Sequence, residues 1–135
     1  MYGDRIAVLG FSAGGHLAGC AATMAENKPN AAILGYAVTR GEDVQMCEST
    51  APDVISAVTE ETCPCFVFAT CNDQLVAVEN SVNFLQALAQ KGVTFESHIY
   101  AYGPHGFSTG DTSVQNRESH FAAGCRIGWR TVSDG

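Results

Sequence analysis

The sequence predicts an α/β fold in which a mostly parallel sheet is flanked by helices. Two observations support this: short apolar runs alternate with segments of helical spacing, and the runs end in Gly-rich or Asn-Asp turns. Strands that are covered on both faces are continuous apolar runs, and helical crossovers between them make neighbouring strands parallel. Ligands of such sheets bind at the carboxyl ends of the strands, so polar residues just after a strand are the first candidates for function.

The first part of the chain predicts a strand, a helix and a second strand. Arg5-Ile6-Ala7-Val8-Leu9-Gly10 is an apolar run typical of a central strand. Small residues dominate from Ala13 to about Ala25, which lowers helix propensity but permits close packing of a buried helix on a sheet. Ala31-Ala32-Ile33-Leu34-Gly35-Tyr36 predicts the second strand. A polar stretch from Thr39 to Thr62 follows, and we expect one short helix in it, near Pro52 to Val58.

The second part predicts two more strands and two helices. Cys65 to Thr70 is rich in aromatic and β-branched residues and ends at the turn-prone pair Asn72-Asp73. Gly92 stands where the C-terminal cap of the next helix belongs. Val93 to Tyr102 alternates as a strand does, and the segment from about Gln115 to Val132 predicts a last helix. The apolar residues at helical spacing before Gly92 are Val78, Val82, Leu85, Leu88 and Ala89.

Composition limits the classes of function. The chain has 135 residues, 46% of them hydrophobic, and 7 Lys+Arg against 14 Asp+Glu give a net charge of −7. This predicts one globular domain over residues 1–135 with a core of its own. The few scattered cations argue against nucleic-acid and anionic-membrane partners. No apolar run approaches the roughly 18 residues of a membrane span, and the start does not read as a signal peptide, so we expect a cytoplasmic location.

The six cysteines predict neither a disulfide scaffold nor a metal site. Their density is low, and we expect most of them to be buried, reduced thiols. Cys63-Pro64-Cys65 is the one close pair, and a zinc site needs two further ligands at matching spacing that the sequence does not offer. We therefore expect no metal.

Gly10-Phe11-Ser12-Ala13-Gly14 is a Gly-x-Ser-x-Gly pattern at a predicted strand-to-helix turn. A nucleophilic serine needs a tight, strained turn that exposes its hydroxyl, and the flanking glycines remove side chains that would clash there. The backbone N–H of Ala13, at the start of a helix, is then placed to stabilise an oxyanion. The alternative is structural, because a serine at this position is also a common helix N-cap.

A serine nucleophile requires a base and a carboxylate, and both are present after later strands. Asp73 follows the third predicted strand and His105 follows the fourth, which gives the order Ser, Asp, His expected of α/β-hydrolases. Asp43, after the second strand, is a fallback for the acid. The remaining histidines, which we expect to be structural or exposed, are His16, His98 and His120.

Three motifs together resemble the C-terminal part of an α/β-hydrolase of the acetyl esterase and lipase type, near the carbohydrate-esterase and prolyl-oligopeptidase-like branches. They run from Asp4 to Ala18 around Gly-Phe-Ser-Ala-Gly-Gly-His, from Asn72 to Ser81, and from Gly103 to Phe107 around Pro-His-Gly. The resemblance implies Ser12 as nucleophile, His105 as general base, Asp73 as the acid that orients it, and Ala13 as an oxyanion donor. It implies a small ester as substrate and no cofactor.

The sequence departs from that family in three places. Ala77 stands where the family often has Pro, and Pro104 where it has Gly. The family also has several strands and a His-Gly-Gly type loop before the nucleophile, and this sequence has neither. The resemblance therefore implies about the second half of the domain, a truncated α/β-hydrolase. The function it implies is hydrolysis of small carboxylic esters, and we expect acetyl esters of a carbohydrate. The alternatives are a prolyl-oligopeptidase-like peptidase and an inactive half-domain that forms homo-oligomers through an exposed sheet edge.

Overall fold

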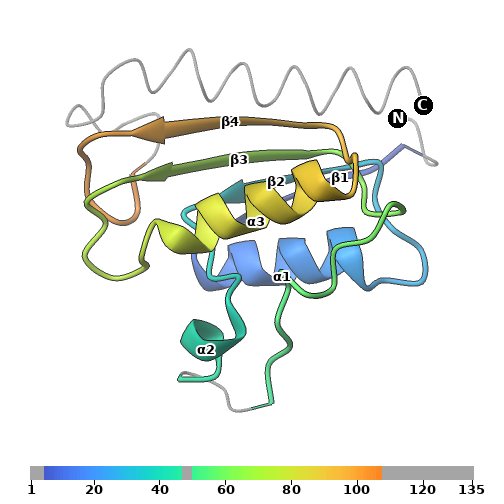
Figure 1. The fold of residues 1–135 in the computed structure, drawn as a ribbon, viewed down its shortest axis with the longest axis horizontal. Coiled ribbons are helices and arrows are strands. Elements are labelled where there is room, and N and C mark those ends of the chain that lie inside the picture. Colours follow the sequence, from blue (N-terminus) through green and yellow to red (C-terminus); the bar gives the residue numbers. More distant parts are fainter. Residues whose placement is uncertain (1–4, 47–49, 108–135) are drawn as a thin grey trace.

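The computed structural model describes residues 5–46 and 50–107, and these residues form a four-stranded parallel sheet with helices packed on it (Figure 1). The strands follow one another across the sheet in chain order, and every neighbouring pair is parallel. The predicted α/β class and the four predicted strands are confirmed. The strands are β1 (Ala7–Phe11), β2 (Ala31–Gly35), β3 (Cys65–Thr70) and β4 (Phe95–Tyr100).

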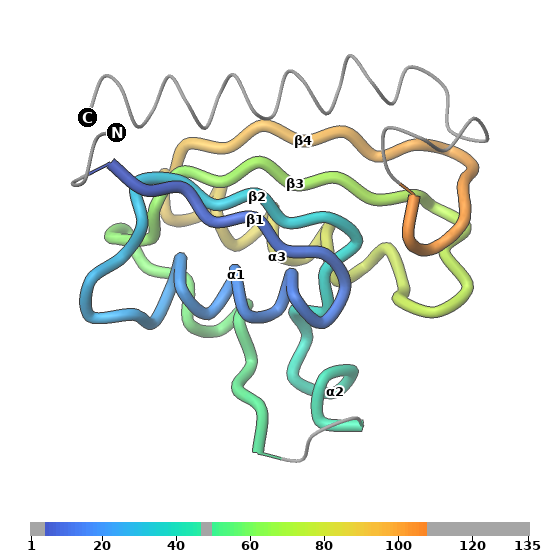
Figure 2. The backbone as a smooth tube through the Cα atoms, turned by 180° about the vertical axis from the view of Figure 1, so that it is seen from behind, coloured from blue at the N-terminus to red at the C-terminus, as the bar shows by residue number. Residues whose placement is uncertain are grey.

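The two longer helices lie on the same face of the sheet (Figure 2). They are α1 (Ala13–Thr23), which joins β1 to β2, and α3 (Glu79–Gln90), which joins β3 to β4. Crossovers between parallel strands are right-handed, so a sheet whose strands follow in one direction places its crossover helices on one side. The third connection, from β2 to β3, is a long excursion away from the sheet that holds the short helix α2 (Gly41–Val44).

The main core lies between the sheet and these helices. Alternate sheet residues such as Val8, Leu34 and Val67 point to this side and pack with Phe84 and Leu88 of α3. The side chains of Leu34, Phe84 and Leu88 are completely buried. The small residues predicted between β1 and β2 do form a helix, and its Ala18 and Ala22 pack in the same cluster.

The opposite face of the sheet carries an aromatic cluster. Phe66 and Phe68 of β3 are buried there beside Tyr36 and Phe107, and the Phe68 and Phe107 ring centroids are 5.4 Å apart. Tyr36 follows β2 and Phe107 lies in the segment after β4, so the cluster joins the carboxyl ends of several strands. This is the edge of the sheet at which the candidate site lies.

The long excursion differs from the sequence-based prediction. The expected helix near Pro52 to Val58 is wrong: the chain makes turns there, and the completely buried Val54 packs into the main core while its N–H donates to the Thr39 carbonyl at 3.1 Å. The helix in this region is α2, earlier in the chain. The predicted helix from Gln115 to Val132 lies outside the described residues.

The end of α3 follows the prediction, and the prediction for the cysteines is tested only in part, because Cys47 and Cys125 lie outside the described residues. Gly92 has a φ of +69°, a conformation that glycine adopts without strain, and the Val93 N–H closes the helix end by donating to the Leu88 carbonyl at 3.0 Å. The cysteines that the structure describes are free thiols; Cys63 and Cys65 are buried, Cys20 is partly buried and Cys71 is exposed. No helix within 5–46 and 50–107 is long and apolar enough to cross a membrane.

Candidate active site

The three residues proposed for nucleophilic chemistry meet at the carboxyl edge of the sheet. Ser12 directly follows β1, Asp73 lies in the turn after β3, and His105 lies in the segment after β4. Strands of a parallel sheet end at the same edge, so side chains far apart in the sequence converge there. The structure thus brings together the three residues that the sequence singled out.

Ser12 sits in a strained turn between β1 and α1. Its φ of 55° and ψ of −118° are rare for a residue with a side chain. The turn is tight, because a Cβ added to Gly10 would lie 2.0 Å from the Gly14 carbonyl oxygen. The Ser12 side chain makes no capping hydrogen bond to the helix, so the N-cap alternative is wrong. Its hydroxyl is directed instead to the imidazole of His105.

A continuous hydrogen-bonded chain links Asp73, His105 and Ser12. His105 Nδ1 lies 2.7 Å from Asp73 Oδ2, and His105 Nε2 lies 2.9 Å from Ser12 Oγ. A carboxylate only accepts hydrogen bonds, so Nδ1 carries the proton and Nε2 is free to accept the serine O–H. This is the tautomer that a general base needs, with its lone pair aimed at the hydroxyl.

Asp73 is held rigidly by its own turn. Its Oδ1 accepts hydrogen bonds from the N–H groups of Leu75 and Val76, both at 2.8 Å, while Oδ2 faces His105. The Asp73 side chain is 1% exposed and that of His105 is 16% exposed. Hydrogen bonds of this kind stabilise a buried carboxylate and fix its direction. Asp73, and not the fallback Asp43, is therefore the partner of the imidazole.

Three contacts position the segment that carries His105. Gly103 is fixed from both sides, because its N–H donates to Asn72 Oδ1 and its carbonyl accepts from Thr70 Oγ1, each at 2.9 Å. The ring of Tyr36 packs edge-on against the His105 imidazole with centroids 4.7 Å apart. Tyr36 was not predicted as a site residue, although its place at the end of a predicted strand was a usable signal.

Tyr36 has a strained backbone and a buried side chain. It is the second non-glycine residue with a positive φ, +35°, among those described, and its side chain is buried. Burial, with the nearby negative charge of Asp73, raises the pKa of the Tyr36 phenol. The phenol therefore stays neutral beside the Asp73–His105 pair at physiological pH.

A cavity of about 430 Å³ opens beside the serine and the histidine. Its wall includes Ala13, whose N–H is the first of the helix N–H groups that have no partner within the helix. An oxyanion formed next to Ser12 would meet this donor and the positive end of α1. The residues that line the cavity are Ser12, Ala13, Val38, Asp43, Met46, Leu75, Val76, Ala77 and His105.

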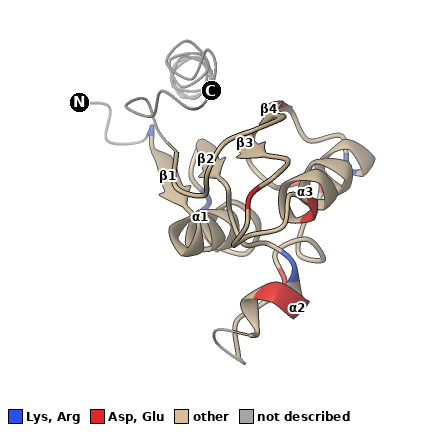
Figure 3. Ribbon diagram, turned by 90° about the vertical axis from the view of Figure 1, so that its left-hand side faces the viewer, with Lys and Arg blue, Asp and Glu red and all other residues tan. Residues whose placement is uncertain are grey.

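One wall of this cavity belongs to α2 and is locked to α3 by Asn80. The Asn80 side chain is completely buried; its Oδ1 accepts from the N–H groups of Thr39 and Arg40, both at 2.9 Å, and its Nδ2 donates to Asp43 Oδ2 at 2.8 Å. Arg40 also pairs with Asp43, at 2.9 Å from Nε to Oδ2. Figure 3 shows α2 as an acidic segment with a basic residue close beside it. Neither Asn80, which lies within the second sequence motif, nor Arg40 was predicted as a site residue.

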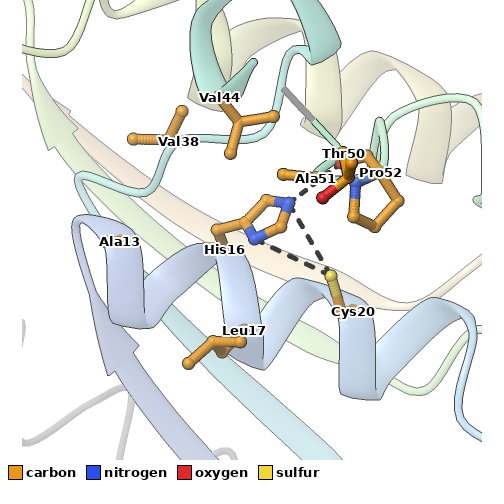
Figure 4. A pocket seen from close by; sticks show the side chains of 9 residues that line it. All are labelled: Ala13, His16, Leu17, Cys20, Val38, Val44, Thr50, Ala51 and Pro52. Atoms are coloured by element: carbon orange, nitrogen blue, oxygen red, sulfur yellow. Dashed lines mark hydrogen bonds between the residues drawn. The ribbon is translucent and has the colours of Figure 1, made fainter. Parts of the chain in front are cut away.

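A second cavity, of about 490 Å³, lies between α1 and the excursion (Figure 4). It shares Ala13 and Val38 with the first cavity but contains neither Ser12 nor His105. Here His16 donates from Nε2 to the Pro52 carbonyl at 2.9 Å, which ties the excursion to α1. Burial raises the pKa of the neighbouring Cys20 thiol, so it stays protonated. The structural role expected for His16 agrees with this contact.

The other histidines do not join the site. His98 lies on β4 with its ring 5.6 Å from that of Phe66, and His120 lies outside the described residues. Within the described ranges no group of three or more His, Cys, Asp or Glu side chains is arranged to hold a metal ion.

Comparison with known proteins agrees with this geometry. The model of the dienelactone hydrolase family, which is part of the α/β-hydrolase superfamily, matches residues 1–132. The chain belongs to the dienelactone hydrolase family. Its α/β-hydrolase architecture, expected from the three motifs, is confirmed by solved structures of the same fold.

Three relatives illustrate the relationship. The acetyl ester-xyloside bifunctional hydrolase of Caldicellulosiruptor lactoaceticus is 29% identical, with a TM-score of 0.79 over 92% of this chain and 56% of that one. An α/β hydrolase from a Medee basin deep-sea metagenome library is 30% identical, with a TM-score of 0.76 over 96% of this chain and 55% of that one. Endo-1,4-beta-xylanase B of Butyrivibrio fibrisolvens is 28% identical, and the match covers 78% of this chain and 21% of that protein.

This member of the dienelactone hydrolase family thus spans about half the length of the solved structures and about a fifth of the xylanase.

Proposed function

We propose that the protein is a serine hydrolase that cleaves small carboxylic esters, with Ser12 as nucleophile, His105 as general base and Asp73 as orienting acid. The observation that carries the proposal is the hydrogen-bonded chain from Asp73 through His105 to a serine in a strained turn. A strained backbone at a serine whose hydroxyl meets an imidazole is energetically costly, and such strain is concentrated at functional sites. Family membership supports the same reaction class.

The geometry accounts for each step of ester cleavage. Ser12 Oγ attacks the acyl carbon while His105 Nε2 takes its proton, and the imidazolium that forms is stabilised by Asp73. The oxyanion of the tetrahedral intermediate lies against the N–H of Ala13. The protonated histidine then gives its proton to the departing alcohol, which leaves an acyl group on Ser12. Water, activated by the same histidine, releases the acid and regenerates the serine.

The substrate we propose is an acetyl ester on a carbohydrate alcohol. Two of the similar proteins are named as an acetyl ester-xyloside bifunctional hydrolase and an endo-1,4-beta-xylanase, and these names support the proposal of a carbohydrate ester. The cavity of about 430 Å³ is in the range of small-molecule sites. A prolyl peptide amide is the alternative substrate to be tested beside the ester.

The test combines labelling with turnover. The purified chain is treated with a fluorophosphonate, and intact-protein mass spectrometry shows whether a covalent adduct forms. In parallel, the rates of hydrolysis of 4-nitrophenyl acetate and of a proline-containing peptide amide are measured. Ser12→Ala should abolish the single adduct and lower ester turnover about 10⁴-fold or more. The matched control is Ser56→Ala, which removes an exposed serine hydroxyl. Retained turnover in Ser12→Ala, or faster cleavage of the amide than of the ester, contradicts the proposal.

A second candidate property is self-association through the edge of the sheet. β1 is an edge strand of the sheet formed by the described residues; Leu9 within it is 48% exposed, and Ile6 just before it is 55% exposed. Exposed apolar edge strands tend to pair with another chain. Size-exclusion chromatography with light scattering tests this property. A homo-oligomer that Leu9→Lys dissociates supports it, and a wild-type monomer contradicts it.

A further inference from the structure

We infer that Asp43 is a specificity residue of the site: its carboxylate accepts a hydrogen bond from a hydroxyl group of a neutral, polyhydroxylated alcohol held beside Ser12. The inference rests on the proposed ester hydrolysis and assigns the alcohol half of the substrate to the α2 wall of the cavity. Asp43 was the fallback for the acid of the triad. With Asp73 in that place, the presence of the Asp43 carboxylate in the wall of the cavity needs a different explanation.

The position of Asp43 is the first support. It lines the cavity that also contains Ser12 and His105, and its side chain is 28% exposed, so an atom of a bound molecule can reach it. Among the described residues that line the cavity, Asp43 is the one acidic group outside the triad, and none is Lys or Arg. This wall therefore offers a bound molecule a hydrogen-bond acceptor.

The second support is the way the carboxylate is held. Oδ2 accepts from Arg40 Nε at 2.9 Å and from Asn80 Nδ2 at 2.8 Å, whereas Oδ1 accepts from Arg40 at the longer distance of 3.3 Å. A carboxylate has about four acceptor positions, so Oδ1 keeps capacity for a donor from the cavity. The group is anchored through Oδ2 to buried Asn80, which makes it a preorganised acceptor rather than a mobile surface charge.

The charge state selects the kind of donor. Burial raises the pKa of Asp43, but hydrogen bonds from Arg40 and Asn80 and the charge of Arg40 outweigh it, so the net pKa is lowered and the group is ionised at neutral pH. An ionised carboxylate accepts from hydroxyl groups and repels anionic esters. Its pairing with Arg40 offsets its attraction for a cation. A neutral sugar alcohol fits these conditions best.

The experiment compares the acetyl esters of two alcohols built on six-membered rings: a monoacetylated methyl xyloside, whose sugar keeps free hydroxyl groups, and cyclohexyl acetate, whose ring has none. The readout is the ratio of their kcat/KM values. In Asp43→Asn, Arg40 Nε and Asn80 Nδ2 keep the amide oxygen at the place of Asp43 Oδ2. The NH₂ group then takes the place of Oδ1, so the cavity wall presents a donor where the wild type presents an acceptor. We expect the ratio to fall about tenfold, the effect of losing one hydrogen bond to a charged group.

The matched control is Glu42→Gln. Glu42 lies on α2 like Asp43 and also pairs with Arg40, with 3.3 Å between Glu42 Oε1 and an Arg40 Nη atom, so the variant removes the same charge. The Glu42 side chain is 74% exposed and does not line the cavity. We expect this variant to leave the ratio within about twofold, which separates a local hydrogen bond from the general negative charge of the protein.

The outcomes separate this inference from the proposed function. If ester turnover depends on Ser12 but the ratio of kcat/KM values is unchanged in Asp43→Asn, or changes equally in Glu42→Gln, the role of Asp43 is overturned and the proposed function stands. Absence of wild-type ester turnover overturns the proposed function and the inference with it. If circular dichroism shows that Asp43→Asn does not fold, competitive inhibition of the wild type decides. Stronger inhibition by methyl xyloside than by cyclohexanol supports the inference, and equal inhibition overturns it.

Discussion

Replacing Asp73 by Asn should remove the proposed activity without disturbing the fold. Asp73 Oδ1 accepts from the N–H groups of Leu75 and Val76, so the oxygen of an asparagine must stay on that side to satisfy them. The NH₂ group then takes the place of Oδ2, 2.7 Å from His105 Nδ1. Two donors cannot face each other at this distance. His105 must therefore move its proton from Nδ1 to Nε2 and direct it at Ser12.

The magnitude follows from this exchange of tautomers. With a proton on Nε2 the imidazole cannot accept the serine proton, and a change of this kind costs about 10⁴-fold in kcat, or about 5.4 kcal/mol. The free energy of unfolding should change by no more than about 1.5 kcal/mol, because both backbone donors keep an acceptor. The assay is kcat for 4-nitrophenyl acetate, with a urea unfolding curve for the same sample.

A matched control tests whether any lost carboxylate has the same effect. Asp53 Oδ1 also accepts from two backbone N–H groups, those of Gly41 at 3.0 Å and Ile55 at 3.3 Å, but it does not contact a histidine. Asp53→Asn should keep kcat within about threefold. If Asp73→Asn retains more than a tenth of the wild-type kcat, the tautomer argument is refuted, and Asp43 becomes the next carboxylate to test.

Three further predictions concern stability. Gly10→Ala should lower the free energy of unfolding by at least about 3 kcal/mol, because the added Cβ would lie 2.0 Å from a backbone oxygen. The control Gly14→Ala adds a Cβ that meets nothing within 4 Å, so it should leave this free energy unchanged or raise it by up to about 1 kcal/mol. Urea unfolding measures both variants. Asn80→Ala should lower the free energy of unfolding by about 2–5 kcal/mol, because it leaves the buried N–H groups of Thr39 and Arg40 without an acceptor. Gln86→Ala, at an exposed position of the same helix, should lower it by less than about 0.5 kcal/mol. Thermal unfolding of the two variants tests this difference. The raised pKa of Tyr36 stabilises the fold below pH 10, and this contribution is lost as the pH rises through the folded-state pKa. Tyr36→Phe should therefore lose less stability than the wild type between pH 8 and 10.5.

The strands and the candidate site were predictable because their signals are local. All six residues of β3 are buried, which is why the run from Cys65 to Thr70 reads as a continuous apolar segment. Ser12, Asp73 and His105 each follow a strand, and the fold itself brings strand ends together. A prediction of the sheet was therefore already a prediction that these three side chains meet.

The excursion was not predictable because distant residues determine it. α2 has four residues, of which only Val44 is buried, so no amphipathic pattern marks it. Side chains from elsewhere satisfy the N–H groups at its start: Asn80 accepts from Thr39 and Arg40, and Asp53 accepts from Gly41. Since Asn80 lies 40 residues away from Arg40 in the chain, no local reading of Thr39 to Thr62 contains this information.

The register of the sheet links its packing to its chemistry. Each strand end is fixed by its neighbour: the Ser12 N–H donates to the Gly35 carbonyl at 2.9 Å, and the Tyr36 N–H donates to the Phe68 carbonyl at 2.7 Å. A slip of one residue would turn every side chain of a strand to the other face, so burial of Leu34 and Val67 on the helix side fixes the register. The same register sets where Ser12 and Tyr36 emerge relative to His105. The free energy of core burial therefore holds both positive-φ residues in place, and substitutions that loosen the core should loosen the Ser12–His105 contact before they unfold the chain.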